Sequence, residues 1–208
     1  YIRKYLGPLF ERERVRTKLQ TSDSHSREIG LKNFPVILDD PDARKYIAAA
    51  SMHGYLWDEQ GSAPMGAFHL RYPEIPVWQS EVCYARTIDK RAMPVYDFDD
   101  GDRWGRMIIA DLENWASGWI YWNAILDHKG GPWLVSPEHN DPADNPQHPV
   151  VIVNTETKEV TYTGLYYYLA HFSKFVRPGY KRIAVSGTLP DTHMAAFRGE
   201  LGARVLEV

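Results

Sequence analysis

The sequence lacks several features that would assign a chain to a structural class at once. Its 208 residues include a single cysteine, Cys83, so no disulfide can form within the chain. No apolar run approaches the ~18 residues that a membrane-spanning helix requires. The formal net charge is only -3, so there is no broad basic field to attract nucleic acid. We therefore expect neither a transmembrane segment nor a nucleic-acid partner.

The common metal and cofactor motifs are absent as well. The sequence has no His-Glu-x-x-His pattern, no cysteine pair for zinc, no Gly-x-Ser-x-Gly turn and no phosphate-binding loop. The 8 histidines are scattered. We expect no metal ion and no organic cofactor, and nothing in the sequence indicates the oligomeric state.

Aromatic residues, in contrast, are abundant, with 7 Trp and 13 Tyr. Buried aromatic side chains supply much of the apolar area of ordinary cores, and this is their commoner role. The faces of such rings also stack on the C–H groups of sugars. Composition alone favours a large core in a globular protein and leaves a sugar site open.

Strands and helices are predicted to alternate along most of the chain. The hydrophobic patterns predict strands at residues 17–24, 49–56, 75–83 and 119–126. They predict helices at residues 1–16 with an interruption at Gly7-Pro8, at 42–48 after an Asp40 cap, and at 102–116, which Gly118 is expected to close. A hairpin across residues 155–158 and a helix over residues 165–176 follow.

This order of elements is typical of an α/β fold with parallel strands and crossover helices. Four strand–helix units make half of a (β/α)8 TIM barrel, which takes ~250 residues. Beyond Arg177 the pattern changes to short strands without a helix. We predict the C-terminal half of a TIM barrel over residues 1–177 and the first strands of an all-β sandwich over residues 178–208.

Half a barrel leaves open sheet edges, so we expect the chain to be part of a longer protein. The first residues already show helical spacing and the last residues already alternate like a strand. No targeting signal can be read from such ends.

A carboxylate lies near the end of the predicted strand 75–83. Alternation places Val77, Gln79, Glu81 and Cys83 on one face. In barrels the carboxyl ends of strands hold the catalytic groups, so Glu81 is a candidate nucleophile or acid. A surface glutamate just past a strand is the ordinary alternative.

Neighbouring predicted strands carry further candidates. His53 and Tyr55 share one face of the strand before Glu81, and Trp122 lies on the strand after it. If these faces point into the mouth of a barrel, the four side chains converge, with a tyrosine hydroxyl beside the carboxylate and a Trp ring as a sugar-stacking floor. For His53 and Trp122, a packed core side chain is an equally good interpretation.

Several of these segments together resemble the glucosylceramidase family of glycoside hydrolases, family 30. The resemblance covers nearly the whole chain and rests on segments that occur in the family's order: Tyr5-Leu6-Gly7-Pro8, residues 40–46, Met52-His53-Gly54-Tyr55, Ser80-Glu81-Val82-Cys83, residues 118–123, Gly130-Gly131-Pro132 and residues 169–175.

The resemblance implies a retaining mechanism. Glu81 would attack the anomeric carbon, and a second Glu ~5–5.5 Å away would act as acid and base. By similarity, Tyr55 would orient Glu81, His53 and Trp122 would line the subsite for the sugar, and Cys83 would shape the pocket. The substrate would be a carbohydrate or glycolipid, and a secreted or lysosome-like location is expected.

Three departures from the family pattern are visible. The family's Asn-Glu-Pro sequence, which carries the acid/base, does not occur here and is expected upstream of Tyr1. Tyr121 stands where lysosomal-type members have Asp, and the loop 136–149 is longer than in those members. We expect hydrolysis of a β-glucoside such as glucosylceramide by the parent protein and no activity of the chain alone. The alternatives are a β-1,6-glucanase, a β-xylosidase and a sugar-binding protein without activity.

Overall fold

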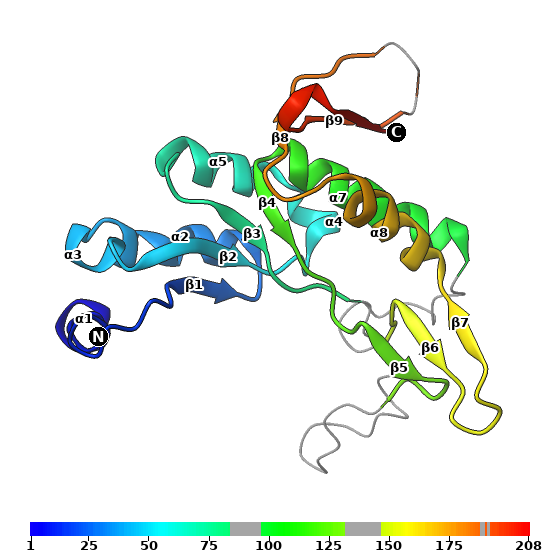
Figure 1. Cartoon of the computed structure of the whole chain (residues 1–208), viewed down its shortest axis with the longest axis horizontal. Coiled ribbons are helices and arrows are strands. Elements are labelled where there is room, and N and C mark those ends of the chain that lie inside the picture. The colour runs from blue at the N-terminus through cyan, green and yellow to red at the C-terminus, as the bar shows by residue number, and fades with distance from the viewer. Residues whose placement is uncertain (84–96, 132–146, 188–189, 191) are drawn as a thin grey trace. The chain divides into compact units, whose positions relative to one another are not determined.

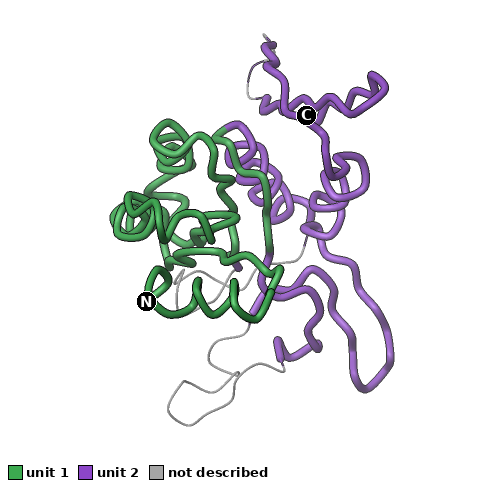
Figure 2. The backbone as a smooth tube through the Cα atoms, turned by 60° about the vertical axis from the view of Figure 1, so that its left-hand side comes forward, with its two compact units in different colours: residues 1–82, 114–120 green, residues 83–113, 121–208 purple. Residues whose placement is uncertain are grey.

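The computed structural model describes residues 1–83, 97–131, 147–187, 190 and 192–208 (Figure 1). These residues form two compact units that are interleaved in the sequence. The first unit contains residues 1–82 and 114–120, and the second contains residues 83–113 and 121–208 (Figure 2). No helix in the described ranges is both long and apolar enough to cross a membrane.

The first unit is built on a parallel four-stranded sheet in the order β1-β2-β3-β4 (Figure 1). The strands are β1 (Leu19–Ser24), β2 (Ile47–Met52), β3 (Val77–Gln79) and β4 (Ala116–Trp119). The helical elements of this unit are a π-helical turn η1 (Ile2–Leu6), α1 (Gly7–Arg12), α2 (Arg27–Leu38), α3 (Pro41–Arg44), α4 (Trp57–Gln60) and α5 (Ala63–Arg71). Parallel strands in sequential order confirm the predicted α/β class.

The hydrophobic core of this unit lies between the sheet and its helices. Helix α2 packs against β1, β2 and α5, and α5 also packs against β3. Ala50, Val77 and Ala116 are paired across the three adjacent strands and belong to this core. Alternation then puts the next row on the opposite face of the sheet. That row consists of Ser22, Ser51, Trp78 and Gly118.

Helices α2 and α5 are absent from the sequence-based prediction, and tertiary packing explains why they form. Helix α2 contains Gly30 and an internal Pro35, both of which disfavour a helix. Its Phe34 and Leu38 are nevertheless fully buried. Burial of such side chains stabilises each by roughly 1.5–3 kcal/mol, which offsets the poor local propensity.

The helix cap at Asp40 is confirmed, although the helix is shorter than expected. Asp40 Oδ1 accepts hydrogen bonds from the backbone nitrogens of Asp42 at 3.0 Å and Ala43 at 3.3 Å. The helix ends at Arg44 because the chain then enters β2 at Ile47.

The strands end earlier than predicted. Strand β2 stops at Met52 and β3 at Gln79, and β4 occupies residues 116–119 rather than 119–126. Gly118 does not close a helix; it lies inside β4, where a Cβ atom would be 3.0 Å from Trp78 Cγ. The absence of a side chain therefore lets β4 pair beside a large ring.

The second unit combines two packed helices with two small sheets. Helices α7 (Phe98–Glu113) and α8 (Gly164–Phe175) pack against each other. Trp104, Met107 and Ile108 are buried on α7, whereas Trp115 lies beyond the helix and is 49% exposed. Gly105 allows the close approach of α8, since a Cβ there would be 2.4 Å from a Tyr168 ring carbon.

The two sheets of this unit each have three strands. The first has the order β5-β6-β7, from β5 (Ile125–Asp127), β6 (Val151–Val153) and β7 (Val160–Tyr162). The antiparallel pairing of β6 with β7 confirms the predicted hairpin. The second sheet is antiparallel with the order β10-β9-β8, from β8 (Lys181–Ile183), β9 (Ala195–Arg198) and β10 (Arg204–Glu207), with a short 3-10 turn η2 (Glu200–Gly202) before β10.

The separate antiparallel sheet after residue 177 agrees with the change of pattern seen in the sequence. Strand β9 contacts α7 and β10 contacts α8, and all of these elements belong to one compact unit. The domain boundary near Arg177 therefore stays a prediction.

Candidate functional site

Glu81 follows β3 at the carboxyl end of the parallel sheet. Its side chain is 30% exposed. The backbone nitrogen of Ser80 donates to the carbonyl of Met52 at 3.1 Å, and the Glu81 carbonyl accepts from Gly54 at 2.7 Å. These bonds fasten the segment that carries Glu81 to the segment that follows β2. Strict alternation along β3 would place the Glu81 side chain on the core face with Val77. Because β3 ends at Gln79, the Glu81 side chain does not follow that alternation.

Tyr55 makes the most direct contact with this carboxylate. Its hydroxyl donates to Glu81 Oε1 at 3.0 Å, and its side chain is buried. The ring stacks on His25 at a centroid distance of 5.4 Å. Because both the ring and the hydroxyl are held, the bond fixes the orientation of the Glu81 carboxylate.

His53 lies between two carboxylates. Its Nδ1 is 3.6 Å from Glu81 Oε1, and its Nε2 is 3.5 Å from Asp23 Oδ1. Both distances exceed those of good hydrogen bonds, so these are electrostatic contacts. The imidazole ring also packs edge-on against Tyr55 at 5.7 Å. The structure thus brings together three of the predicted residues, His53, Tyr55 and Glu81.

Asp23 is a member of this cluster that the sequence analysis missed. It lies near the carboxyl end of β1, and its carboxylate accepts a hydrogen bond from the Ser80 hydroxyl at 2.7 Å. The rule that drew attention to Glu81, an acidic residue at the carboxyl end of a predicted strand, applies to Asp23 as well. Applied to residues 17–24, it would have found Asp23.

Cys83 and Trp122 belong to the second unit. The Cys83 thiol is buried and donates to Gln147 Oε1 at 3.0 Å. Trp122 lies beyond the end of β4 and is 45% exposed. Their proposed places beside Glu81 stay predictions, and so does the role of the loop 136–149. Residues 136–146 of that loop lie outside the described part of the chain, and Pro132 does too.

Tyr121 has a structural partner within the second unit. Its hydroxyl is 2.9 Å from His148 Nδ1, and His148 Nε2 is 3.0 Å from Asp100 Oδ2. The geometry at Asp100 is too poor for a hydrogen bond, although the distance is that of an ion pair. His148 is fully buried, and the Tyr121 ring packs edge-on against Trp104. The hydroxyl of Tyr121 thus serves an internal contact.

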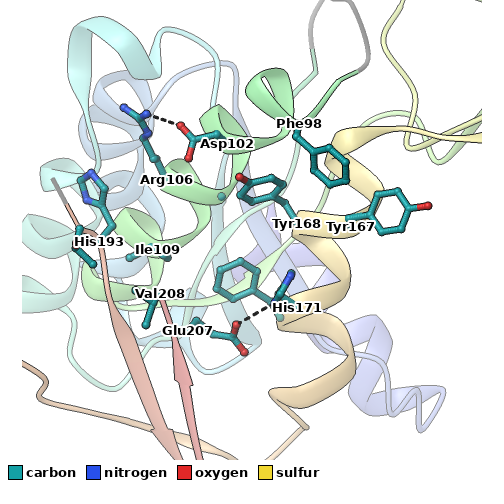
Figure 3. A pocket seen from close by; sticks show the side chains of 13 residues that line it. Phe98, Asp102, Arg106, Ile109, Tyr167, Tyr168, His171, His193, Glu207 and Val208 are labelled. Atoms are coloured by element: carbon teal, nitrogen blue, oxygen red, sulfur yellow. Dashed lines mark ion pairs between the residues drawn. The ribbon is translucent and has the colours of Figure 1, made fainter.

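A cavity of about 460 Å³ lies in the second unit, between α7, α8 and the end of β10 (Figure 3). Burial raises the pKa of the Glu207 carboxyl on its wall, and His171 Nδ1 at 3.7 Å opposes this effect. None of the candidate residues lines this cavity. Within the described ranges there is also no group of three or more His, Cys, Asp or Glu side chains that could hold a metal ion. The strand-end cluster is therefore the candidate site.

The fold and the cluster define a class: a parallel α/β barrel segment with a tyrosine-bound carboxylate at the carboxyl ends of its strands. The chain belongs to glycosyl hydrolase family 30, because the model of this family's TIM-barrel domain matches residues 1–176.

The proteins to which this chain is similar include glycosidases. The chain is 28% identical to lysosomal acid glucosylceramidase of Mus musculus, over 100% of this chain and 39% of that protein. It is 25% identical to an endo-1,6-β-D-glucanase of Neurospora crassa, over 100% of this chain and 41% of that protein. A solved endo-β1,6-glucanase superposes with a TM-score of 0.76 and 25% identity, over 99% of this chain and 44% of that structure. The chain thus spans about two fifths of the length of these proteins.

Proposed function

We propose that this chain supplies the nucleophile half of the active site of a retaining β-glycoside hydrolase, with Glu81 as the nucleophile. The observation that supports this most is the 3.0 Å bond from the Tyr55 hydroxyl to Glu81 Oε1. It joins residues from the ends of two adjacent parallel strands, which is where barrel enzymes carry out their chemistry.

In the proposed reaction a Glu81 oxygen forms a bond to the anomeric carbon while the bond to the leaving oxygen breaks. The leaving oxygen takes a proton from a second carboxyl group, which then removes a proton from the water that hydrolyses the glycosyl ester. Tyr55 orients the attacking carboxylate, and the His53 ring packs beside it. We assign Trp122 to the sugar subsite and Cys83 to its wall by family resemblance. The second carboxylate is not assigned to any residue of this chain.

The substrate class is a β-linked glucoside. The mouse relative favours a glucosylceramide-like glycolipid. The fungal relative and the solved glucanase give a second candidate, a β-1,6-linked glucan. Comparing hydrolysis of the two substrates by the protein that carries this chain decides between them.

The assignment of Glu81 is tested by Glu81→Gln in the protein that carries this chain. The amide is nearly the same shape but cannot form the glycosyl ester, so we expect kcat to fall by more than about 10⁴-fold while ground-state binding of substrate is kept. Mass spectrometry after a slow fluoro-sugar substrate should place the label on the peptide that contains Glu81.

The matched control is Glu74→Gln. Glu74 is an exposed carboxylate of the same unit whose partner is Arg44 at 3.1 Å, and its loss should leave kcat unchanged. Full activity of Glu81→Gln, or a label on another peptide, would remove Glu81 from the mechanism. Sugar binding without turnover in both the unaltered protein and the variant would instead identify a non-catalytic carbohydrate-binding protein.

A further inference from the structure

The contact between Asp23 and His53 is not explained by the assignment of the nucleophile. Asp23 Oδ1 lies 3.5 Å from His53 Nε2, on the opposite side of the imidazole from Glu81. The His53 side chain is 14% exposed, so most of the ring is enclosed and few orientations are available to it. The two carboxylates therefore face the two nitrogens of one ring.

The aim of the Asp23 carboxylate is set by two further features. Asp23 has a backbone φ of 56°, in the left-handed region that L-residues other than Asn and Asp seldom occupy. In addition, the Ser80 hydroxyl donates to Oδ1, the same oxygen that faces His53, at 2.7 Å. Backbone conformations of this kind collect at functional sites.

Stability does not account for this arrangement. The Asp23 side chain is 59% exposed, and solvent screens ion pairs of such groups so strongly that many contribute nothing measurable to folding. A contact that hardly stabilises the fold, yet is oriented by a left-handed backbone conformation and a hydroxyl, is better explained by an effect on its neighbour.

We infer that Asp23 is a positioning residue, which holds the His53 ring so that Nδ1 faces the Glu81 carboxylate. This inference rests on the proposed function. Its chemical consequence follows from the charge of Glu81. When Glu81 becomes a glycosyl ester, the carboxylate that faces Nδ1 no longer carries a full negative charge. Asp23 forms no ester, so its contact with Nε2 persists and the ring stays in place for the second step, the release of Glu81.

The kinetic test is Asp23→Asn in the protein that carries this chain. The amide preserves the shape but not the charge, so we expect kcat to fall roughly 10- to 100-fold, as small misplacements at active sites do, with KM changed less than threefold. Asp23→Glu, which keeps the charge, should recover part of the loss. Asp102→Asn breaks an exposed ion pair with Arg106 on α7 and should leave kcat unchanged.

A second readout needs no turnover and also uses the protein that carries this chain. In ¹⁵N NMR of the imidazole groups, Asp23→Asn should shift the His53 nitrogen signals. It should not shift those of His69, whose ring stacks on Trp115 at 3.8 Å in the same unit. A disturbance of the whole fold would move both sets of signals.

The two proposals fail in different ways. An active Glu81→Gln variant would remove the nucleophile whatever Asp23 does. An inactive Glu81→Gln variant, together with unchanged kcat and unchanged His53 signals in Asp23→Asn, would overturn the positioning role alone.

Discussion

At the residue scale, two carboxylates occupy similar places and differ in their surroundings. Glu81 and Asp23 each lie at the carboxyl end of a parallel strand and each face His53. Glu81 is bound by the buried Tyr55 hydroxyl and is 30% exposed, whereas Asp23 is bound by Ser80 and is 59% exposed. The more enclosed carboxylate, Glu81, suits a reaction in which its oxygen forms a bond to carbon, because less water competes for that oxygen.

The residues of the candidate site differ in how far the sequence reveals them. His53, Tyr55 and Glu81 follow from a rule about strand ends, and their mutual contacts agree with it. The same rule applies to Asp23, but two features that orient its carboxylate lie outside that rule: the left-handed backbone of Asp23 and the Ser80 hydroxyl, 57 positions along the chain. Neither feature leaves a local pattern in the sequence.

Tyr72 provides a residue-scale prediction for alkaline pH. Burial, and then the bond from its hydroxyl to Asp39 Oδ1 at 2.6 Å, raises the pKa of Tyr72 to about 12. In the unfolded chain a tyrosine pKa is about 10. The stabilisation is therefore complete below pH ~10 and is lost as pH rises through the folded-state pKa.

We expect Tyr72→Phe to lower the free energy of unfolding by about 1 kcal/mol at pH 8. The deficit should shrink between pH 10 and 12, because the unaltered protein loses the contribution of the phenol in that window. Urea unfolding at a series of pH values measures both effects. A constant difference between the two proteins up to pH 12 would show that Tyr72 titrates normally.

At the element scale, the sequence predicts the order of strands and helices better than their ends. The parallel strands β1 and β3 lie within their predicted ranges, and β2 overlaps its range but begins two residues before it, at Ile47. Helix α2 was not predicted because Gly30 and Pro35 have low helix propensity. The helix forms because Phe34 and Leu38 pack into the core. The role of Gly118 depends on Trp78 in the neighbouring strand, which local sequence cannot show.

Gly118→Ala tests the fit between β3 and β4. The added Cβ would meet Trp78 Cγ at 3.0 Å and two adjoining ring carbons at 3.1 Å. These atoms are at the base of the ring and move little, so we expect a net destabilisation of about 1–3 kcal/mol in urea unfolding.

Trp78→Leu removes the ring that an alanine at position 118 would contact. In that background Gly118→Ala should cost about 1 kcal/mol less, which a double-mutant cycle measures as a coupling energy. Equal costs in both backgrounds would mean that Gly118 is needed for a reason other than the Trp78 ring.

At the scale of the whole molecule, the segment after Arg177 can be tested as a domain. Strand β9 contacts α7 and β10 contacts α8, and Ala195, Ala196 and Phe197 are buried. We expect a chain that ends at residue 177 to show faster amide hydrogen exchange in α7 and α8, because their covered faces become exposed. Exchange in β2 and β3 serves as the internal reference and should stay slow. Unchanged exchange in α7 and α8 would show that residues 178–208 form an independent domain.

The interleaving of the two units has a consequence for biosynthesis. Strand β3 pairs with β4, but β4 belongs to a segment that is made only after all of α7. A ribosome adds about 5–20 residues per second. The amide and carbonyl groups on the edge of β3 that pairs with β4 therefore stay unpaired for seconds during synthesis. Such an edge can pair with another nascent chain. We therefore expect the edge of β3, just before Glu81, to be open to such pairing until β4 has been made.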